Sequence, residues 1–180
     1  CLSELKQGDA VRMAVTATAE ASYVYTATKS KPEPRALEQV TVGVSDLAAS
    51  RAGFDRAVAI VKGVEVAKEW ANRPGNHATP TRLADAARQL AKAPHIRCAV
   101  MGPKQVAKLG MGAFLAVAQG SHEELRFIEL RYQGGAKDEA PTVLIGKGIS
   151  FDSGGISIKP AAEMDEMKFD MGGAASVLGV

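Results

Sequence analysis

The fold is decided by residues 143–155, which read Val143-Leu144-Ile145-Gly146-Lys147-Gly148-Ile149-Ser150-Phe151-Asp152-Ser153-Gly154-Gly155. The apolar run that opens this stretch is typical of a strand buried on both faces of a sheet. The glycine-rich run that follows lies beyond the carboxyl end of that strand, where ligand sites of α/β sheets are found. The sequence therefore predicts a strand over 142–147 that leads into a binding loop.

This loop matches neither of the common phosphate-binding patterns. In the P-loop a glycine stands five residues before a Gly-Lys pair and a serine or threonine follows it, but Pro141 and Gly148 occupy those places. In the dinucleotide fingerprint a third glycine is needed where Phe151 stands. Phosphate binding is therefore not expected here.

Acidic and basic side chains crowd the same region. Carboxylate oxygens suit Mn²⁺, Mg²⁺ and Zn²⁺, and a bridging carboxylate can hold two ions side by side. The alternative is a solvated charged loop, and residue types alone do not decide which acids face inward. The charged residues concerned are Lys147, Asp152, Lys159, Glu163, Asp165, Glu166, Lys168 and Asp170.

Outward from this region, the hydrophobic periodicity predicts alternating helices and strands, which favours an α/β layered domain. The clearest helix, over 48–72, has one apolar face formed by Phe54, Val58, Val61, Val64 and Ala67. The other predicted helices cover 9–27, with Asp9 as its cap, 79–91 and 103–109. The other predicted strands cover 40–44, 96–100 and 125–132, and a proline-broken linker covers 29–34.

Composition excludes several classes of protein. Hydrophobic residues make up 46% and charged residues 23% of the 180 residues, which excludes a disordered or fibrous chain. The net charge of +2 is too small to indicate nucleic acid or a membrane surface as the main partner. No apolar run reaches the roughly 18 residues of a membrane span.

The cysteines and histidines indicate no metal site by their spacing. Cys1 and Cys98 cannot form a disulfide framework or a zinc motif, and Cys98 is expected to be a core thiol. The three histidines are too scattered for a zinc triad and are expected in loops or on the surface; they are His77, His95 and His122.

The ends of the chain indicate a piece of a longer protein. The chain begins at Cys1 rather than at methionine, and it stops at Val180 within an apolar run that has no helix-ending residue behind it. We therefore expect further sequence on both sides.

Three motifs resemble those of the leucyl aminopeptidases, also called the cytosol aminopeptidase family. The resemblance covers nearly the whole chain and is strongest from residue 143 onward. The motifs are Gly146-Lys147-Gly148-Ile149-Ser150-Phe151-Asp152-Ser153-Gly154-Gly155-Ile156-Ser157-Ile158-Lys159-Pro160, then Met164-Asp165-Glu166-Met167-Lys168-Phe169-Asp170-Met171-Gly172-Gly173-Ala174-Ala175, and Asn72-Arg73-Pro74-Gly75-Asn76-His77-Ala78-Thr79-Pro80-Thr81.

The resemblance implies two divalent metal ions per subunit, Mn²⁺ or Zn²⁺. It places Lys147 on one metal, Asp152 between both, and Asp170 on the same metal as Lys147. Lys159 matches the family's catalytic lysine, and Met167 matches a residue of the pocket for the substrate's first side chain. By the same mapping three further acids are solvated and are not ligands; these are Glu163, Asp165 and Glu166.

The chemistry of the two lysines fits these roles. Lys147 must be neutral to bind a metal, and burial or an adjacent dication lowers a lysine pKa. Lys159 binds no metal in this mapping, so it can stay charged, polarise the peptide carbonyl and stabilise the oxyanion.

The family's second acidic motif, Asn-Thr-Asp-Ala-Glu-Gly-Arg, is absent from this sequence. In the family it supplies one more aspartate, a second bridging glutamate and a catalytic arginine. We therefore expect the parent protein to be the aminopeptidase and this segment alone to be inactive.

The resemblance also implies the architecture and the partners. Residues 1–46 would be the tail of a smaller α/β N-terminal domain and a linker; residues 47–180 would be a connecting helix and the first half of a three-layer catalytic domain with helices flanking its sheet. The expected protein is a cytoplasmic, homohexameric enzyme that releases leucine-like residues from peptides with a free N-terminus, with no membrane contact.

Two other functions stay open. A DNA-binding regulator is known among bacterial relatives, but the small net charge supports it weakly. A relative without metals is disfavoured because Lys147, Asp152, Lys159 and Asp170 are all present.

Overall fold

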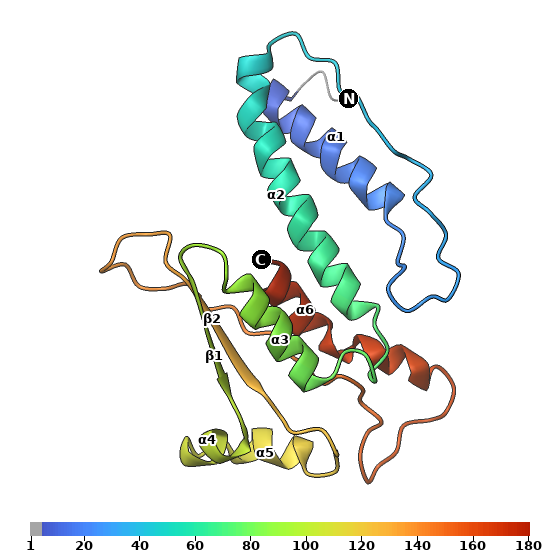
Figure 1. Ribbon diagram of the computed structural model, residues 1–180, viewed down its shortest axis with the longest axis vertical. Coiled ribbons are helices and arrows are strands. Elements are labelled where there is room, and N and C mark those ends of the chain that lie inside the picture. Colours follow the sequence, from blue (N-terminus) through green and yellow to red (C-terminus); the bar gives the residue numbers. More distant parts are fainter. Residues whose placement is uncertain (1–4) are drawn as a thin grey trace. The chain divides into compact units, whose positions relative to one another are not determined.

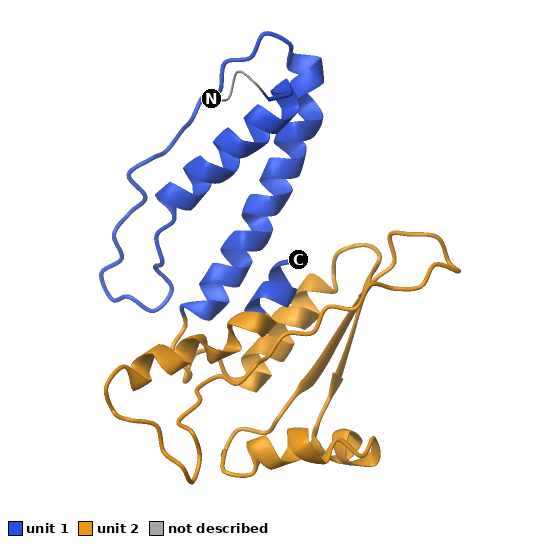
Figure 2. Cartoon of the chain, turned by 180° about the vertical axis from the view of Figure 1, so that it is seen from behind, with its two compact units in different colours: residues 1–72, 175–180 blue, residues 73–174 orange. Residues whose placement is uncertain are grey.

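The computed structural model describes residues 5–180, and Cys1 lies outside the described residues. The chain divides into two compact units (Figure 2). Unit 1 comprises Cys1–Asn72 and Ala175–Val180, and unit 2 comprises Arg73–Ala174. No helix of the described part is long and apolar enough to cross a membrane.

Unit 1 is built on two long helices that lie side by side, α1 (Gln7–Ser22) and α2 (Leu47–Ala71) (Figure 1). The α2 helix confirms the prediction over 48–72. It begins where the Asp46 side chain accepts a hydrogen bond from the Ala49 backbone nitrogen at 3.0 Å. Such a cap satisfies one of the amide groups that the first turn of a helix leaves without a partner.

The α1 helix is confirmed with different ends. It begins two residues before Asp9, which lies in the first turn and pairs with Arg12 at 3.5 Å instead of capping the helix. It ends at Ser22, because the tyrosines and threonines that follow favour extended backbone.

The buried face of α2 matches the predicted apolar face only in part. Phe54 and Val64 are both more than 40% exposed, whereas Ser50 and Ala57 are buried. The helices approach too closely for large side chains, since a methyl group at Gly53 would overlap the Gly8 carbonyl of α1. Small residues therefore form the contact between the helices at this point, whereas Val61 and Val64 face α1 farther along α2.

We expect Gly53→Ala to destabilise the protein although alanine is the better helix former. The added methyl overlaps the Gly8 backbone, and overpacking of this kind costs about 1–3 kcal/mol. The matched control is Gly112→Ala in α5, where a methyl group meets nothing within 4 Å. Urea unfolding of both variants measures the difference; a Gly53→Ala variant as stable as the control would contradict the close contact.

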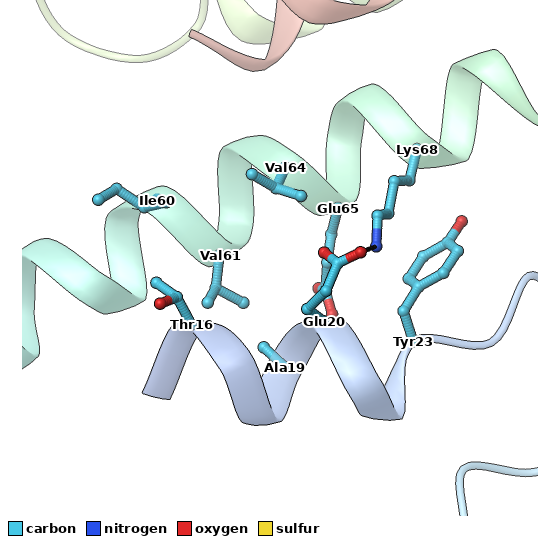
Figure 3. Close-up of a pocket in the computed structure, with 9 residues that line it drawn as sticks. All are labelled: Thr16, Ala19, Glu20, Tyr23, Ile60, Val61, Val64, Glu65 and Lys68. Atoms are coloured by element: carbon cyan, nitrogen blue, oxygen red, sulfur yellow. Dashed lines mark ion pairs between the residues drawn. The ribbon is translucent and has the colours of Figure 1, made fainter. Parts of the chain in front are cut away.

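A cavity of about 70 Å³ lies between α1 and α2, beyond the small-residue contact (Figure 3). Lys68 pairs with Glu20 across it at 2.6 Å, and its ammonium lies 4.8 Å from the centre of the Tyr23 ring. Burial raises the pKa of Tyr23. The figure shows these side chains meeting at one end of the cavity, where they tie the two helices together.

Unit 2 contains a sheet of two antiparallel strands, β1 (Ile96–Met101) and β2 (Phe127–Tyr132), with Ile96 opposite Tyr132. Helix α3 (Pro80–Leu90), predicted over 79–91, contacts both strands of this sheet, and its Leu83 and Ala87 are buried. Thr79 caps α3 by accepting a hydrogen bond from the Arg82 nitrogen at 3.3 Å. The remaining helices of the unit are α4 (Pro103–Lys108), α5 (Gly112–Ala118) and the 3₁₀ helix η2 (Met164–Met171); α6 (Gly172–Gly179) begins in it.

Two predicted strands are wrong. Residues 40–44 and 142–147 run without regular structure, and in the described residues only β1 and β2 pair. A strand forms only where a second strand takes up its backbone hydrogen bonds, and among the described residues no second strand pairs with either segment. The apolar run of 143–145 is therefore exposed rather than buried, with Ile145 exposed to 93%.

The mixed helix and sheet class is confirmed by this arrangement. The boundary between residues 46 and 47 stays a prediction.

Candidate metal site

The candidate site lies within unit 2, where the loop of residues 146–159 meets η2 and the start of α6. All five predicted site residues are in this unit, on the loop or on η2. The structure joins them in two groups. One is Lys147 with Asp170, and the other is Asp152 with Lys159 and Met167.

Lys147 and Asp170 form an ion pair, with 2.7 Å between the lysine Nζ and the Asp170 Oδ1. Asp170 stands at the end of η2, beside the fully buried Met171, and its side chain is only 18% exposed. The Asp170 hydrogen bond and charge raise the pKa of Lys147, and Asp152 contributes in the same direction. Lys147 is therefore an ammonium group in this arrangement.

Asp152 is held from two sides. Its Oδ1 accepts a hydrogen bond from the Gly154 backbone nitrogen at 2.8 Å, and its Oδ2 lies 3.1 Å from the Lys159 Nζ. The Gly154 hydrogen bond first, and then Lys159, lower the pKa of Asp152. Gly154 has φ of 92°, in the left-handed region that glycine adopts without strain. The carboxylate is thus fixed in its charged form.

The Lys159 ammonium also donates to the Met167 sulfur at 2.9 Å. The Lys159 backbone nitrogen donates to the Ser153 carbonyl at 2.9 Å, so the loop folds back on itself. This closure places the Lys159 side chain in contact with both Asp152 and Met167. The resemblance had placed Lys147 and Asp170 on one metal ion, but sequence reasoning missed the closure of the loop and the pairing of Asp152 with Lys159.

The other acids of the segment lie apart from these pairs. Glu163, Asp165 and Glu166 are exposed, as a solvated loop requires. Glu163 precedes η2 in the left-handed conformation with φ of 60°. Among the described residues no group of three or more histidines, cysteines, aspartates or glutamates gathers to hold a metal ion.

The donor set nevertheless suits hard divalent cations. The Asp170 Oδ2 is buried and has no hydrogen-bond partner among the described residues, so a lone-pair donor is left over in the site. Asp152 adds a charged carboxylate, whose oxygens also contact the Gly154 nitrogen and the Lys159 ammonium. The raised pKa of Lys147 opposes metal binding, but a dication beside the amine acts in the opposite direction.

A comparison with protein families decides the relationship. The model for the catalytic domain of the cytosol aminopeptidase family matches residues 65–180. The chain belongs to the cytosol aminopeptidase family. All five predicted site residues lie within the matched range.

Curated relatives of this family align along the whole chain. It is 68% identical over 180 residues to a probable cytosol aminopeptidase of Albidiferax ferrireducens, and 66% identical over 181 residues to one of Polaromonas naphthalenivorans. These alignments cover 100% and 99% of this chain but only 38% and 36% of the relatives. The chain thus spans little more than a third of their length.

A solved structure of similar fold is the bottromycin maturation enzyme BotP in complex with Mn. It superposes with a TM-score of 0.78 at 33% identity, over 94% of this chain and 35% of BotP. A second structure of BotP gives a TM-score of 0.77 at 32% identity. The described fold is therefore that of part of this enzyme's chain.

Proposed function

We propose that this segment supplies part of the dinuclear metal site of an aminopeptidase that releases leucine-like N-terminal residues from peptides. Here the full-length protein means a chain as long as the curated relatives, of which this segment covers 38% or less. The observation that carries the proposal is the gathering of Lys147, Asp152, Lys159 and Asp170 in two ion pairs within the family match. The Mn in the BotP structure supports a divalent metal.

Three residues would hold the metals. Lys147 and Asp170 would share one ion, since their side chains already meet, and Asp152 would lie between both ions. The Asp170 Oδ2 without a partner and the charged Asp152 carboxylate are the donors that Mn²⁺ or Zn²⁺ needs. When bound, such ions supply Lewis-acid activation of a water molecule and a charge that attracts the free amine of the substrate.

Lys159 would act on the substrate rather than on a metal. Its ammonium would polarise the peptide carbonyl and stabilise the negative oxygen that develops during hydrolysis. It lies against Asp152 and the Met167 sulfur, so its charge is beside the Asp152 carboxylate. Met167 would line the pocket for the first side chain, where an apolar thioether favours leucine-like residues.

Further properties of the full-length protein follow from the family. We propose that it acts in the cytoplasm as a homohexamer on peptides with an unblocked N-terminus. The curated relatives are named cytosol aminopeptidases, which supports the compartment and the substrate class. A regulatory role on DNA gains no support from the net charge of +2.

We expect the isolated segment to be inactive. It holds Lys147, Asp152 and Asp170 but lacks the Asn-Thr-Asp-Ala-Glu-Gly-Arg motif that would complete the site. The measurement is hydrolysis of a leucyl amide with added Mn²⁺, with the full-length protein as the positive control. Robust turnover by the segment would show that it does not depend on the missing motif.

A further inference from the structure

The backbone around Lys147 lies directly against the start of α6. A methyl group at Gly146 would overlap the Gly173 carbonyl, and one at Gly173 would lie 2.8 Å from the Lys147 backbone nitrogen. A methyl group at Gly148 would lie 3.2 Å from the Ala174 Cβ. We call this contact of Gly146, Lys147 and Gly148 with Gly173 and Ala174 the glycine seam.

A hydrogen bond fixes the seam. The Ala174 backbone nitrogen donates to the Lys147 carbonyl at 2.8 Å, so the first turn of α6 is tied to the residue that carries the site amine. This bond also satisfies one of the amide groups that a helix start leaves without an intrahelical partner. The position of the Lys147 backbone therefore depends on α6.

The same helix start sets the position of Asp170. Asp170 is the last residue but one of η2, and α6 begins directly after the fully buried Met171. The two partners of the 2.7 Å ion pair thus reach each other from backbones that meet at Gly173. A shift of the seam by a few tenths of an ångström moves Lys147 relative to Asp170.

Glycine at position 173 serves the close approach and not an unusual backbone conformation. Positive φ values occur at Gly110, Gly154 and Gly155 but not at Gly172 or Gly173. The backbone conformation therefore allows alanine at both Gly172 and Gly173. A methyl group at Gly172 meets nothing within 4 Å, whereas one at Gly173 meets the Lys147 backbone.

We propose that Gly173 is a positioning residue, which sets the distance between Lys147 and Asp170 by letting α6 contact the Lys147 backbone. This inference rests on the proposed function, because it gives the pair a task in holding a metal ion. Groups that orient metal ligands from behind change metal affinity about 10- to 100-fold when they are altered.

The test compares Gly173→Ala with Gly172→Ala in the full-length protein. Co²⁺ is the probe, because its visible absorption spectrum reports the geometry of its ligands. We expect Gly173→Ala to bind Co²⁺ about 10- to 100-fold more weakly and with an altered spectrum. Gly172→Ala should keep the affinity and spectrum of the unchanged protein, and thermal unfolding checks that both variants fold.

A second pair of variants decides the matter if Gly173→Ala does not fold. Gly148→Ala causes a milder overlap than Gly173→Ala, since its methyl group would meet only the Ala174 side chain. We expect it to weaken Co²⁺ binding, and the additional change Ala174→Gly to restore it by removing the opposing methyl group. Ala174→Gly alone is the control for the altered helix.

The outcomes separate the two proposals. Equal Co²⁺ affinity and spectra for Gly173→Ala and Gly172→Ala would overturn the role of Gly173 and leave the proposed function intact. A double variant, Gly148→Ala with Ala174→Gly, that binds Co²⁺ as weakly as Gly148→Ala alone would likewise overturn the role of the seam and leave the proposed function intact. Failure of the unchanged full-length protein to bind Co²⁺ would overturn the proposed function itself.

Discussion

Replacing Asp152 by alanine in the full-length protein is expected to abolish binding of both metal ions and, with it, hydrolysis. Asp152 is the residue proposed to lie between the ions, and it is held in its charged form by Gly154 and Lys159. Since altering a residue behind a ligand already costs about 10- to 100-fold in metal affinity, loss of a shared ligand should cost more than about 100-fold. Metal content after dialysis and turnover of a leucyl amide measure the two effects.

The matched control for this variant is Asp165→Ala. Asp165 is an exposed acid of the same region that the family mapping excludes from the ligands. It should keep both metals and the full rate. An Asp152→Ala protein that retains two ions and normal turnover would show that the mapping of the site is wrong.

The second large effect is expected for Lys159→Ala, which should lower kcat while sparing the metals. Loss of one group that stabilises a developing oxyanion costs about 10²- to 10³-fold in kcat. Lys159 contacts Asp152 and Met167, and no step of metal binding is assigned to it. The two measurements are kcat on a leucyl amide and metal content, made on the same preparation.

Lys168→Ala is the control for the loss of a positive charge. The Lys168 ammonium lies over the Phe169 ring at 4.8 Å and takes part in neither ion pair of the site. This variant should keep kcat close to that of the unchanged protein. Release of the metals by Lys159→Ala would instead mean that Lys159 supports the metal site directly.

Local signals in the sequence were sufficient for the long helices. The α2 and α3 helices lie where the apolar periodicity indicates, and Asp46 and Thr79 cap their first turns. The α5 helix was missed because Gly112–Ala118 is apolar around its whole circumference, which leaves no periodicity to detect.

Features that depend on distant partners could not be predicted from local pattern. The alternation of residues 40–44 is that of a strand, yet nothing in the described residues pairs with it. The predicted apolar face of α2 was right only in part, since Phe54 is exposed beside the close contact of Gly53 with Gly8 while Val61 and Val64 face α1. Strand pairing and the buried face of a helix depend on contacts between segments, which the pattern within one segment does not contain.

The candidate site divides in the same way. Family motifs supplied Lys147, Asp152, Lys159, Met167 and Asp170, but not which of them touch. The pairing of Lys147 with Asp170 requires the backbones at Gly146 and Gly173 to meet. A glycine in a sequence motif does not indicate which segment its backbone contacts. The assignment of these residues as metal ligands and catalytic groups stays a prediction.

The exposed run Val143-Leu144-Ile145 has a practical consequence for any work on the segment in isolation. It is uncharged and free of proline, and its backbone pairs with no strand of the described residues. Exposed apolar segments of high β-propensity pair with segments of neighbouring molecules and lead to aggregation. A preparation of the segment therefore calls for low concentration and a check by light scattering, so that an inactive sample is not simply a precipitated one.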